Sequence, residues 1–163
     1  MFKEQLEQQQ PVVYHTLKNA LENDKLAHAY MFSGPSGTPK KQTAYLLAQS
    51  LVCNEKGFAC ETCDTCQRVL HNEYADMIYI DGTTTSIKKD DIIKLQEAFN
   101  KTGLEEKGKK IYILDHAENA AVPALRRLPN LHGYISDLLV YRIEHPGQVA
   151  HNAAYQHFFQ PIC

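Results

Sequence analysis

The sequence lacks the features that would direct it to a membrane, to export or to nucleic acid. No apolar run approaches the roughly 20 residues of a membrane span, so we expect no membrane association. Residues 1–10 are polar and lack the apolar core of a signal peptide, which favours a cytoplasmic location. Positive charge is not in excess either. The formal net charge of −2 and the pI of about 6.4 give no electrostatic reason for direct nucleic-acid binding.

Lysine is missing from one region only. Residues 121–163 contain none, whereas residues 1–120 contain every lysine of the chain and a single arginine, Arg68. Residues 121–163 hold the other three arginines and four of the eight histidines. This change of composition allows two interpretations: a second subdomain with its own bias, or a change of reading frame near Ala121–Pro123.

Short buried strands alternate with amphipathic helices in residues 1–120. The pattern predicts helices from Pro11 to Leu21, from Lys40 to Val52 and from Asp90 to Phe99. It predicts strands over residues 27–32, 77–80 and 111–115. At 163 residues the chain has the length of a single domain with one core. We therefore predict an α/β domain with a parallel sheet.

A loop that resembles a phosphate-binding loop follows the first predicted strand. The working pattern, G-x-x-x-x-G-K-[ST], is matched at Gly34, at Gly37 inside the loop and at Lys40. Pro39 replaces the second glycine and removes a backbone N–H that would hold phosphate. Lys41 replaces the Ser or Thr hydroxyl that would bind Mg²⁺, and its charge repels the metal. Two interpretations remain: a turn that binds nothing, or weak ATP binding without turnover.

A second acidic motif ends the strand at residues 111–115. Asp115 stands where such ATPases place a metal-bridging aspartate. The next position, normally a glutamate that polarises the attacking water, is His116, and Glu118 comes two residues later. The phosphate loop and the acidic motif have both lost residues that ATP hydrolysis needs. We therefore predict no catalytic residues and no intrinsic catalysis.

Four cysteines cluster in residues 53–66. Cys53, Cys60, Cys63 and Cys66 have the spacing C-x6-C-x2-C-x2-C, and four thiolates complete a tetrahedral zinc shell. In a reducing cytosol such cysteines are typical metal ligands, and not disulfides. A four-thiolate shell has no open position, so we predict a structural zinc knuckle. A reduced cysteine-rich loop without metal is the alternative.

Together these motifs resemble the delta-prime family of bacterial DNA polymerase III subunits, over roughly residues 10–122. The resemblance is carried by the cysteine spacing and by four segments: Leu26–Thr38, Ser86–Lys89, Lys101–Leu104 and Ile111–Asn119. The tau/gamma subunits share the loop and the zinc module. They keep G-K-[ST], however, so Pro39 and Lys41 favour delta-prime.

The resemblance implies an AAA+ module of a clamp loader, the pentamer that opens the sliding clamp and closes it on primed DNA. It maps the nucleotide-binding positions onto Gly34, Gly37, Lys40 and Asp115, and the zinc ligands onto the four cysteines. It implies a rigid, non-hydrolysing subunit of the DNA polymerase III holoenzyme. Its partners would be the tau/gamma and delta subunits and, indirectly, the sliding clamp and primed DNA.

The chain departs from this family after about residue 122. A helix, a sensor strand and a Ser-Arg-Cys segment should follow, and residues 124 onward do not match them. We therefore expect residues 1–122 to form the N-terminal part of the AAA+ domain. We expect residues 123–163 to be an aberrant, poorly ordered tail from a frameshift or truncation, which leaves the sheet without its later strands. Such a tail would not support clamp-loader assembly, and the chain could then be an inactive fragment.

Two other functions remain open from the sequence alone. The chain could be an active nucleotide-hydrolysing AAA+ protein that uses an altered loop, which ATP turnover would reveal. It could instead be a stand-alone zinc-binding interaction module, for which removal of zinc would abolish partner binding and nucleotide would not matter.

Overall fold

The structure, a computed structural model, describes residues 1–27, 29–83, 86–99, 101–119, 138–143 and 161–162. The helices are α1 (Phe2–Gln9), α2 (Pro11–Glu22), α3 (Lys40–Val52), α4 (Asp64–Leu70), α5 (Lys89–Phe99) and the 3₁₀ turn η1 (Ala117–Asn119). The strands are β1 (Ala29–Ser33), β2 (Met77–Asp81), β3 (Ile111–Asp115), β4 (Leu138–Ile143) and β5 (Pro161–Ile162).

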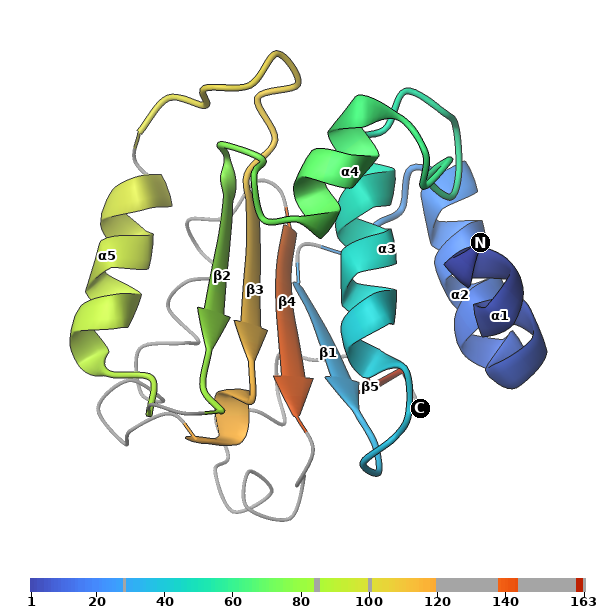
Figure 1. Cartoon of the computed structure of the whole chain (residues 1–163), viewed down its shortest axis with the longest axis horizontal. Coiled ribbons are helices and arrows are strands. Elements are labelled where there is room, and N and C mark those ends of the chain that lie inside the picture. The colour runs from blue at the N-terminus through green and yellow to red at the C-terminus, as the bar shows by residue number, and fades with distance from the viewer. Residues whose placement is uncertain (28, 84–85, 100, 120–137, 144–160, 163) are drawn as a thin grey trace.

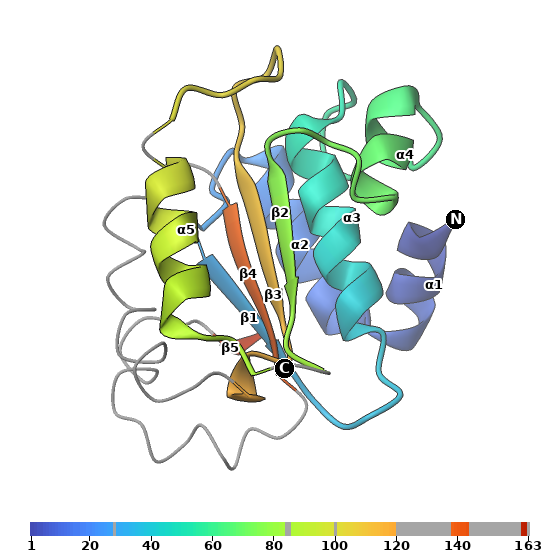
Figure 2. The same ribbon diagram turned by 60° about the vertical axis from the view of Figure 1, so that its left-hand side comes forward.

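The described strands form one parallel sheet in the order β2-β3-β4-β1-β5 (Figure 1). The connection from β1 to β2 crosses the sheet in one direction, and the connection from β2 to β3 runs in the other. Because such crossovers are right-handed, their helices α3 and α5 must cover opposite faces. Figure 2 shows this arrangement, with the strands between α3 and α5. The predicted α/β class is confirmed.

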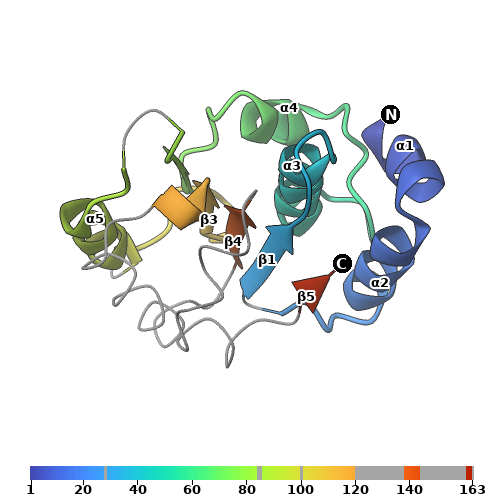
Figure 3. The same cartoon turned by 90° about the horizontal axis from the view of Figure 1, so that it is seen from below.

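Helices α1 and α2 lie at the β1 and β5 end of the sheet, and α4 lies beside α3 (Figure 3). Pro11 begins α2, where its missing N–H costs no hydrogen bond. The sequence analysis missed α1 and α4, which have 8 and 7 residues. Both are too short to show a clear period. In the described residues, no helix has both the length and the apolar character needed to cross a membrane.

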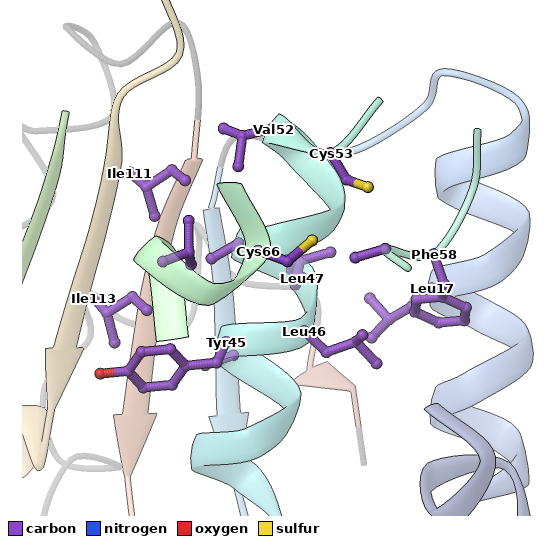
Figure 4. Close-up of a cluster of buried hydrophobic side chains, with 14 of the residues drawn as sticks. Leu17, Tyr45, Leu46, Leu47, Val52, Cys53, Phe58, Cys66, Ile111 and Ile113 are labelled. Atoms are coloured by element: carbon purple, nitrogen blue, oxygen red, sulfur yellow. The ribbon is translucent and has the colours of Figure 1, made fainter. Parts of the chain in front are cut away.

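The core is built around α3. Leu46 and Leu47 are at most 1% exposed, as are Leu17 of α2 and Ile113 of β3. Figure 4 shows Leu46 directed toward Leu17 and Phe58. Each such side chain contributes roughly 1.5–3 kcal/mol on burial. The core therefore joins the sheet, the N-terminal helices and the cysteine segment, residues 53–66, into one unit.

One expectation about the tail is wrong. Residues 138–143 form β4, which pairs with β3 on one side and β1 on the other. Strand β4 therefore lies at the centre of the sheet, where it joins the pair β2 and β3 to the pair β1 and β5. The expected poor order of residues 123–137 and 144–160 lies outside the described residues.

Candidate functional site

The candidate site lies at the carboxyl ends of β1, β2 and β3. In open parallel sheets this edge is where ligands bind, since loops and helix N-termini converge there. The loop after β1 leads into α3 at Lys40, and Asp81 and Asp115 end the paired strands β2 and β3. The structure thus brings the predicted loop and Asp115 to the same edge of the sheet.

The side chain of Lys40 forms hydrogen bonds within its own loop. Lys40 is only 5% exposed, and its Nζ atom donates to Gly34 O at 2.9 Å, to Thr38 Oγ1 at 2.9 Å and to Pro35 O. An ammonium group has three donors, so loop oxygens match its full capacity. Gly37 adopts φ +89°, a conformation that favours glycine. In this structure the Lys40 ammonium group is therefore hydrogen-bonded to oxygens of its own loop.

The space beside the loop is small. A cavity of about 140 Å³ is lined by residues from the loop, from β1, from α3 and from the N-terminal helices, including Leu6 and Gln10. Small-molecule sites usually enclose about 300–1,000 Å³. Leu6 has no exposed surface, so α1 forms a fixed wall of this cavity. This cavity is therefore smaller than a typical small-molecule site.

Asp115 is held by neighbouring side chains. It is 2% exposed, accepts a hydrogen bond from Tyr79 Oη at 2.5 Å, and lies 3.9 Å from Lys41 Nζ. Burial, and then the bond to Asp115, raise the pKa of Tyr79 above its usual value, so the phenol keeps its proton.

His116 follows Asp115 with φ +50°, and its Nδ1 lies 3.2 Å from Glu118 Oε1. Glu118, two residues after His116, therefore contacts a side chain of the same turn.

The four cysteines converge as the sequence predicts. Their Sγ atoms all lie within 4.8 Å of one another. The Cys53–Cys60 and Cys60–Cys66 sulfur pairs are 3.7 and 3.9 Å apart. Zn–S bonds of about 2.3 Å in a tetrahedron place sulfurs about 3.8 Å apart. The donor set therefore fits a four-coordinate zinc ion.

The local structure around these sulfurs shifts the pKa values of Cys60 and Cys66 in opposite directions. Cys53 caps the C-terminus of α3, Cys63 precedes α4, and Cys66 lies on α4. Backbone hydrogen bonds from Thr62 and Cys63 lower the pKa of Cys60 to about 6, because N–H donors stabilise the anion. Burial raises the pKa of Cys66.

Glu61, inside the cysteine segment, contacts the N-terminal helix. Its carboxylate accepts hydrogen bonds from the backbone N–H groups of Phe2 at 2.9 Å and Lys3 at 3.2 Å. Lys3 Nζ donates to Ala59 O at 3.1 Å. These bonds satisfy N–H groups that a helix start leaves without intrahelical partners. The sequence gives no signal for a contact between residues so far apart, so the analysis missed it.

A second anchor holds the loop before β3. Asp76 accepts hydrogen bonds from Leu104 N and Glu105 N, each at 2.7 Å to Oδ2, and Glu105 pairs with Arg68. Hydrogen bonding to Arg68 lowers the pKa of Glu105 below its usual 4.5. The loop is thereby fixed to α4, which carries Cys66.

Comparisons with known proteins agree on one family. A family model described as DNA polymerase III, delta subunit, matches residues 9–128. DNA polymerase III subunit delta' of Bacillus subtilis is 43% identical over 120 residues, which is 73% of this chain and 36% of that protein. DNA polymerase III subunit tau of the same species is 30% identical over 115 residues, 69% of this chain and 20% of that protein. The chain thus spans about a third of the length of its delta' relative.

Solved structures support the same fold. A DNA polymerase III gamma subunit-related protein from Thermotoga maritima aligns with a TM-score of 0.62 at 14% identity, covering 91% of this chain and 45% of that one. The Holliday junction branch migration motor RuvB from T. maritima aligns at 0.56 and 14% identity, covering 94% and 43%. At this identity the likeness concerns the fold alone.

Proposed function

Because the chain belongs to the DNA polymerase III delta-subunit family, we propose that it acts as a non-hydrolysing clamp-loader subunit. In this role it is a structural member of the DNA polymerase III holoenzyme that helps load the sliding clamp on primed DNA. The partners we propose are tau/gamma-type and delta-type subunits. Its relatives named delta' and gamma/tau subunits of DNA polymerase III support a place in that assembly.

The single observation that carries the non-hydrolysing role is the occupied nucleotide edge. Lys40 donates to oxygens of its own loop, and Lys41 pairs with Asp115. Phosphoryl transfer depends on a lysine and a metal ion that both reach the phosphates. Here one lysine is turned into its loop and the other stands at the metal-binding carboxylate. Weak nucleotide binding without turnover is the most that this arrangement supports.

Zinc is the cofactor we assign to the cysteine segment. Cys53, Cys60, Cys63 and Cys66 would hold it, and the sulfur separations support this assignment. Bound zinc would supply structural cross-linking and no chemistry, because four thiolates leave no open coordination position. The segment would then fix α4 against α3.

For the domain organisation, we propose that residues 1–122 are the N-terminal part of a clamp-loader AAA+ domain and that residues 123–163 diverge from the family. The compositional break supports this division, although the family match extends to residue 128. The coding DNA around codons 118–125 tests it. An alternative frame that encodes a family-like helix and a Ser-Arg-Cys segment would support a frameshift, and its absence would contradict one.

Reconstitution tests the proposed role directly. The full chain is mixed with tau/gamma and delta subunits, sliding clamp and primed DNA, and the complex is isolated by gel filtration. We expect the chain to co-elute with them. Lys40→Ala in this chain should leave ATP turnover of the complex unchanged, whereas replacement of the loop lysine in tau/gamma should abolish it. A chain that never joins the complex, or turnover that falls with Lys40→Ala, would overturn the proposal.

A further inference from the structure

A second cavity lies between α1, α3 and α4. It encloses about 410 Å³, within the range of about 300–1,000 Å³ that is usual for small-molecule sites. The α3 residues Gln42, Tyr45 and Gln49 line it, and their steps of three and four residues place them on one face of that helix. Among the described residues, no zinc ligand and no part of the loop after β1 belongs to this lining. The cavity is therefore a second candidate binding site.

The two charged side chains at this cavity already have partners within the chain. Lys41 Nζ lies 3.9 Å from Asp115 Oδ2 and 4.9 Å from the centroid of the Tyr79 ring. Glu61 accepts hydrogen bonds from two backbone N–H groups at the start of α1. An ionic ligand would have to break one of these contacts to gain an ion pair. The cavity therefore favours an uncharged ligand.

Three of the eight lining residues carry neutral side-chain amides, namely Gln42, Gln49 and Asn72. Gln49 is 4% exposed, and its Nε2 donates to Cys66 O at 2.9 Å. The Gln49 oxygen accepts no hydrogen bond within the described part of the chain. Asn72 shows the reverse, because its Oδ1 accepts from Tyr45 Oη at 2.8 Å while its Nδ2 has no acceptor among the described residues. The cavity thus offers an open acceptor on Gln49 and an open donor on Asn72.

Apolar surface completes the lining. Phe2 of α1 is partly buried against the core, and Leu70 at the end of α4 is 47% exposed. Of the four large hydrophobic side chains that the described residues leave exposed, Leu70 alone lines this cavity. Removing apolar surface from water is favourable, so a ligand with an apolar part gains affinity here.

We propose that this cavity is a docking site for an uncharged, extended segment of a partner protein. The backbone of that segment donates an N–H to the Gln49 oxygen and presents a carbonyl oxygen to Asn72 Nδ2, and one aliphatic side chain lies against Leu70 and Phe2. Side-chain amides suit a peptide backbone because both carry a carbonyl acceptor and N–H donors. Such docking goes beyond the clamp-loader role proposed above and needs no nucleotide.

A site for a small neutral molecule is the first competing explanation, and a crevice that holds only water is the second. Small-molecule sites are lined predominantly by hydrophobic and aromatic side chains and bury most of their ligand. Here five of the eight lining residues have charged or amide side chains, and Gln42 and Asn72 are exposed. This polar, open lining favours a segment that continues beyond the cavity on both sides.

An NMR titration of the ¹⁵N-labelled, zinc-loaded chain separates these explanations. The side-chain amide signals of Gln42, Gln49 and Asn72 report on the cavity directly. The first probe is the capped peptide acetyl-Gly-Leu-Gly-amide. The second is the same peptide with glutamate in place of leucine, and the third is adenosine, a neutral small molecule.

Two variants remove one feature of the cavity each. Leu70→Ser removes apolar surface, and Asn72→Asp removes the open donor while it keeps the oxygen that accepts from Tyr45. Aspartate also tolerates the φ of +59° at position 72. Leu104→Ser, at an exposed leucine that does not line the cavity, is the matched control. Zinc content and circular dichroism establish that each variant is folded.

We expect the leucine peptide to shift the three amide signals in a saturable way, and the glutamate peptide and adenosine to leave them in place. Leu70→Ser and Asn72→Asp should each weaken binding of the leucine peptide by about fivefold, the effect of one lost contact. Leu104→Ser should bind it as wild type does. If Leu70→Ser does not fold, Leu70→Ala takes its place, with the same expectation.

Failure of the leucine peptide to shift these signals would overturn the inference, as would equal binding by wild type and both cavity variants. Equal binding of the glutamate peptide would contradict an uncharged partner. Saturable shifts with adenosine and none with the leucine peptide would identify a small-molecule site instead. Failure of the proposed function has a different signature, since ATP turnover by the isolated chain or its absence from the clamp-loader complex is measured without these probes.

Discussion

The cysteine segment and the nucleotide edge are both sequence motifs for binding an ion or a ligand, but they differ in what their functional groups contact. The four sulfurs of the cysteine segment point at one another at separations that match a zinc shell. At the nucleotide edge, Lys40 and Asp115 contact groups of the chain itself. A degenerate motif can therefore be more than a set of lost residues. Here the matching residues Lys40 and Asp115 and the replacement Lys41 all form contacts within the chain.

The two regions are joined through the N-terminal helix. Glu61 of the cysteine segment accepts hydrogen bonds from the start of α1, and Leu6 of α1 lines the cavity beside the phosphate loop. A zinc ion in the cysteine segment would thus support the wall that keeps this cavity small. Substitutions in one region should therefore affect the other, and the size of the effect should depend on the contact that is removed.

The largest effect should come from removing a zinc ligand. Cys60→Ser should lose metal and destabilise the fold by on the order of 5 kcal/mol, because structural zinc contributes folding free energy. Metal content and urea unfolding measure both effects. Cys163→Ser is the matched control and should retain one zinc per chain. Folded, metal-free wild type with four titratable thiols in residues 53–66 would contradict the assignment.

Leu6→Ala should come next, at about 2–5 kcal/mol, because it leaves a cavity under a fully buried side chain. Val12→Ala, at a position 71% exposed on α2, should change stability by less than about 0.5 kcal/mol. Urea unfolding compares the two variants. Similar small effects would mean that α1 is not docked on the core.

Glu61→Gln should have a smaller effect, about 1 kcal/mol, since it keeps the shape and removes the charge at the start of α1. Hydrogen exchange in α1 should accelerate while zinc stays bound. Glu7→Gln, an exposed acid on the same helix, is the control. Unchanged hydrogen exchange in Glu61→Gln would show that the Glu61 contact does not couple the cysteine segment to α1.

The smallest effect concerns the Arg68–Glu105 pair and depends on pH. The folded-state pKa of Glu105 is lowered below 4.5, so its stabilising contribution is present above about pH 4.5 and is lost as pH falls through the lowered value. The difference in Tm between wild type and Glu105→Gln should therefore shrink in acid. Glu106→Gln provides the exposed neighbouring control. A Tm difference between wild type and Glu105→Gln that grows below pH 4.5 would contradict this prediction.

Sequence patterns predicted the elements whose signals are local. The bounds of α3, Lys40–Val52, follow from the apolar face, and β3 follows from a run of buried residues. The short helix α1 was missed because its apolar face has one buried residue, Leu6. The contact of Glu61 with α1 was missed because nothing local specifies it.

The nucleotide edge was only half predictable. Pro39 and Lys41 indicate which parts of the motif are missing. A proline has no N–H to hold phosphate, and an ammonium group repels a metal ion. Where Lys40 and Lys41 direct their ammonium groups depends on tertiary neighbours, namely the loop carbonyl oxygens and Tyr79. Strand β4 was missed for a similar reason, because its place in the sheet is set by pairing with β1 and β3.

Turnover of Mg·ATP by the isolated, zinc-loaded chain tests the central claim most directly, because it asks whether the occupied nucleotide edge performs any chemistry. We predict that wild type releases phosphate no faster than Lys40→Ala under the same conditions. Phosphate release by wild type that Lys40→Ala abolishes would contradict the account and would identify an active ATPase with an altered loop.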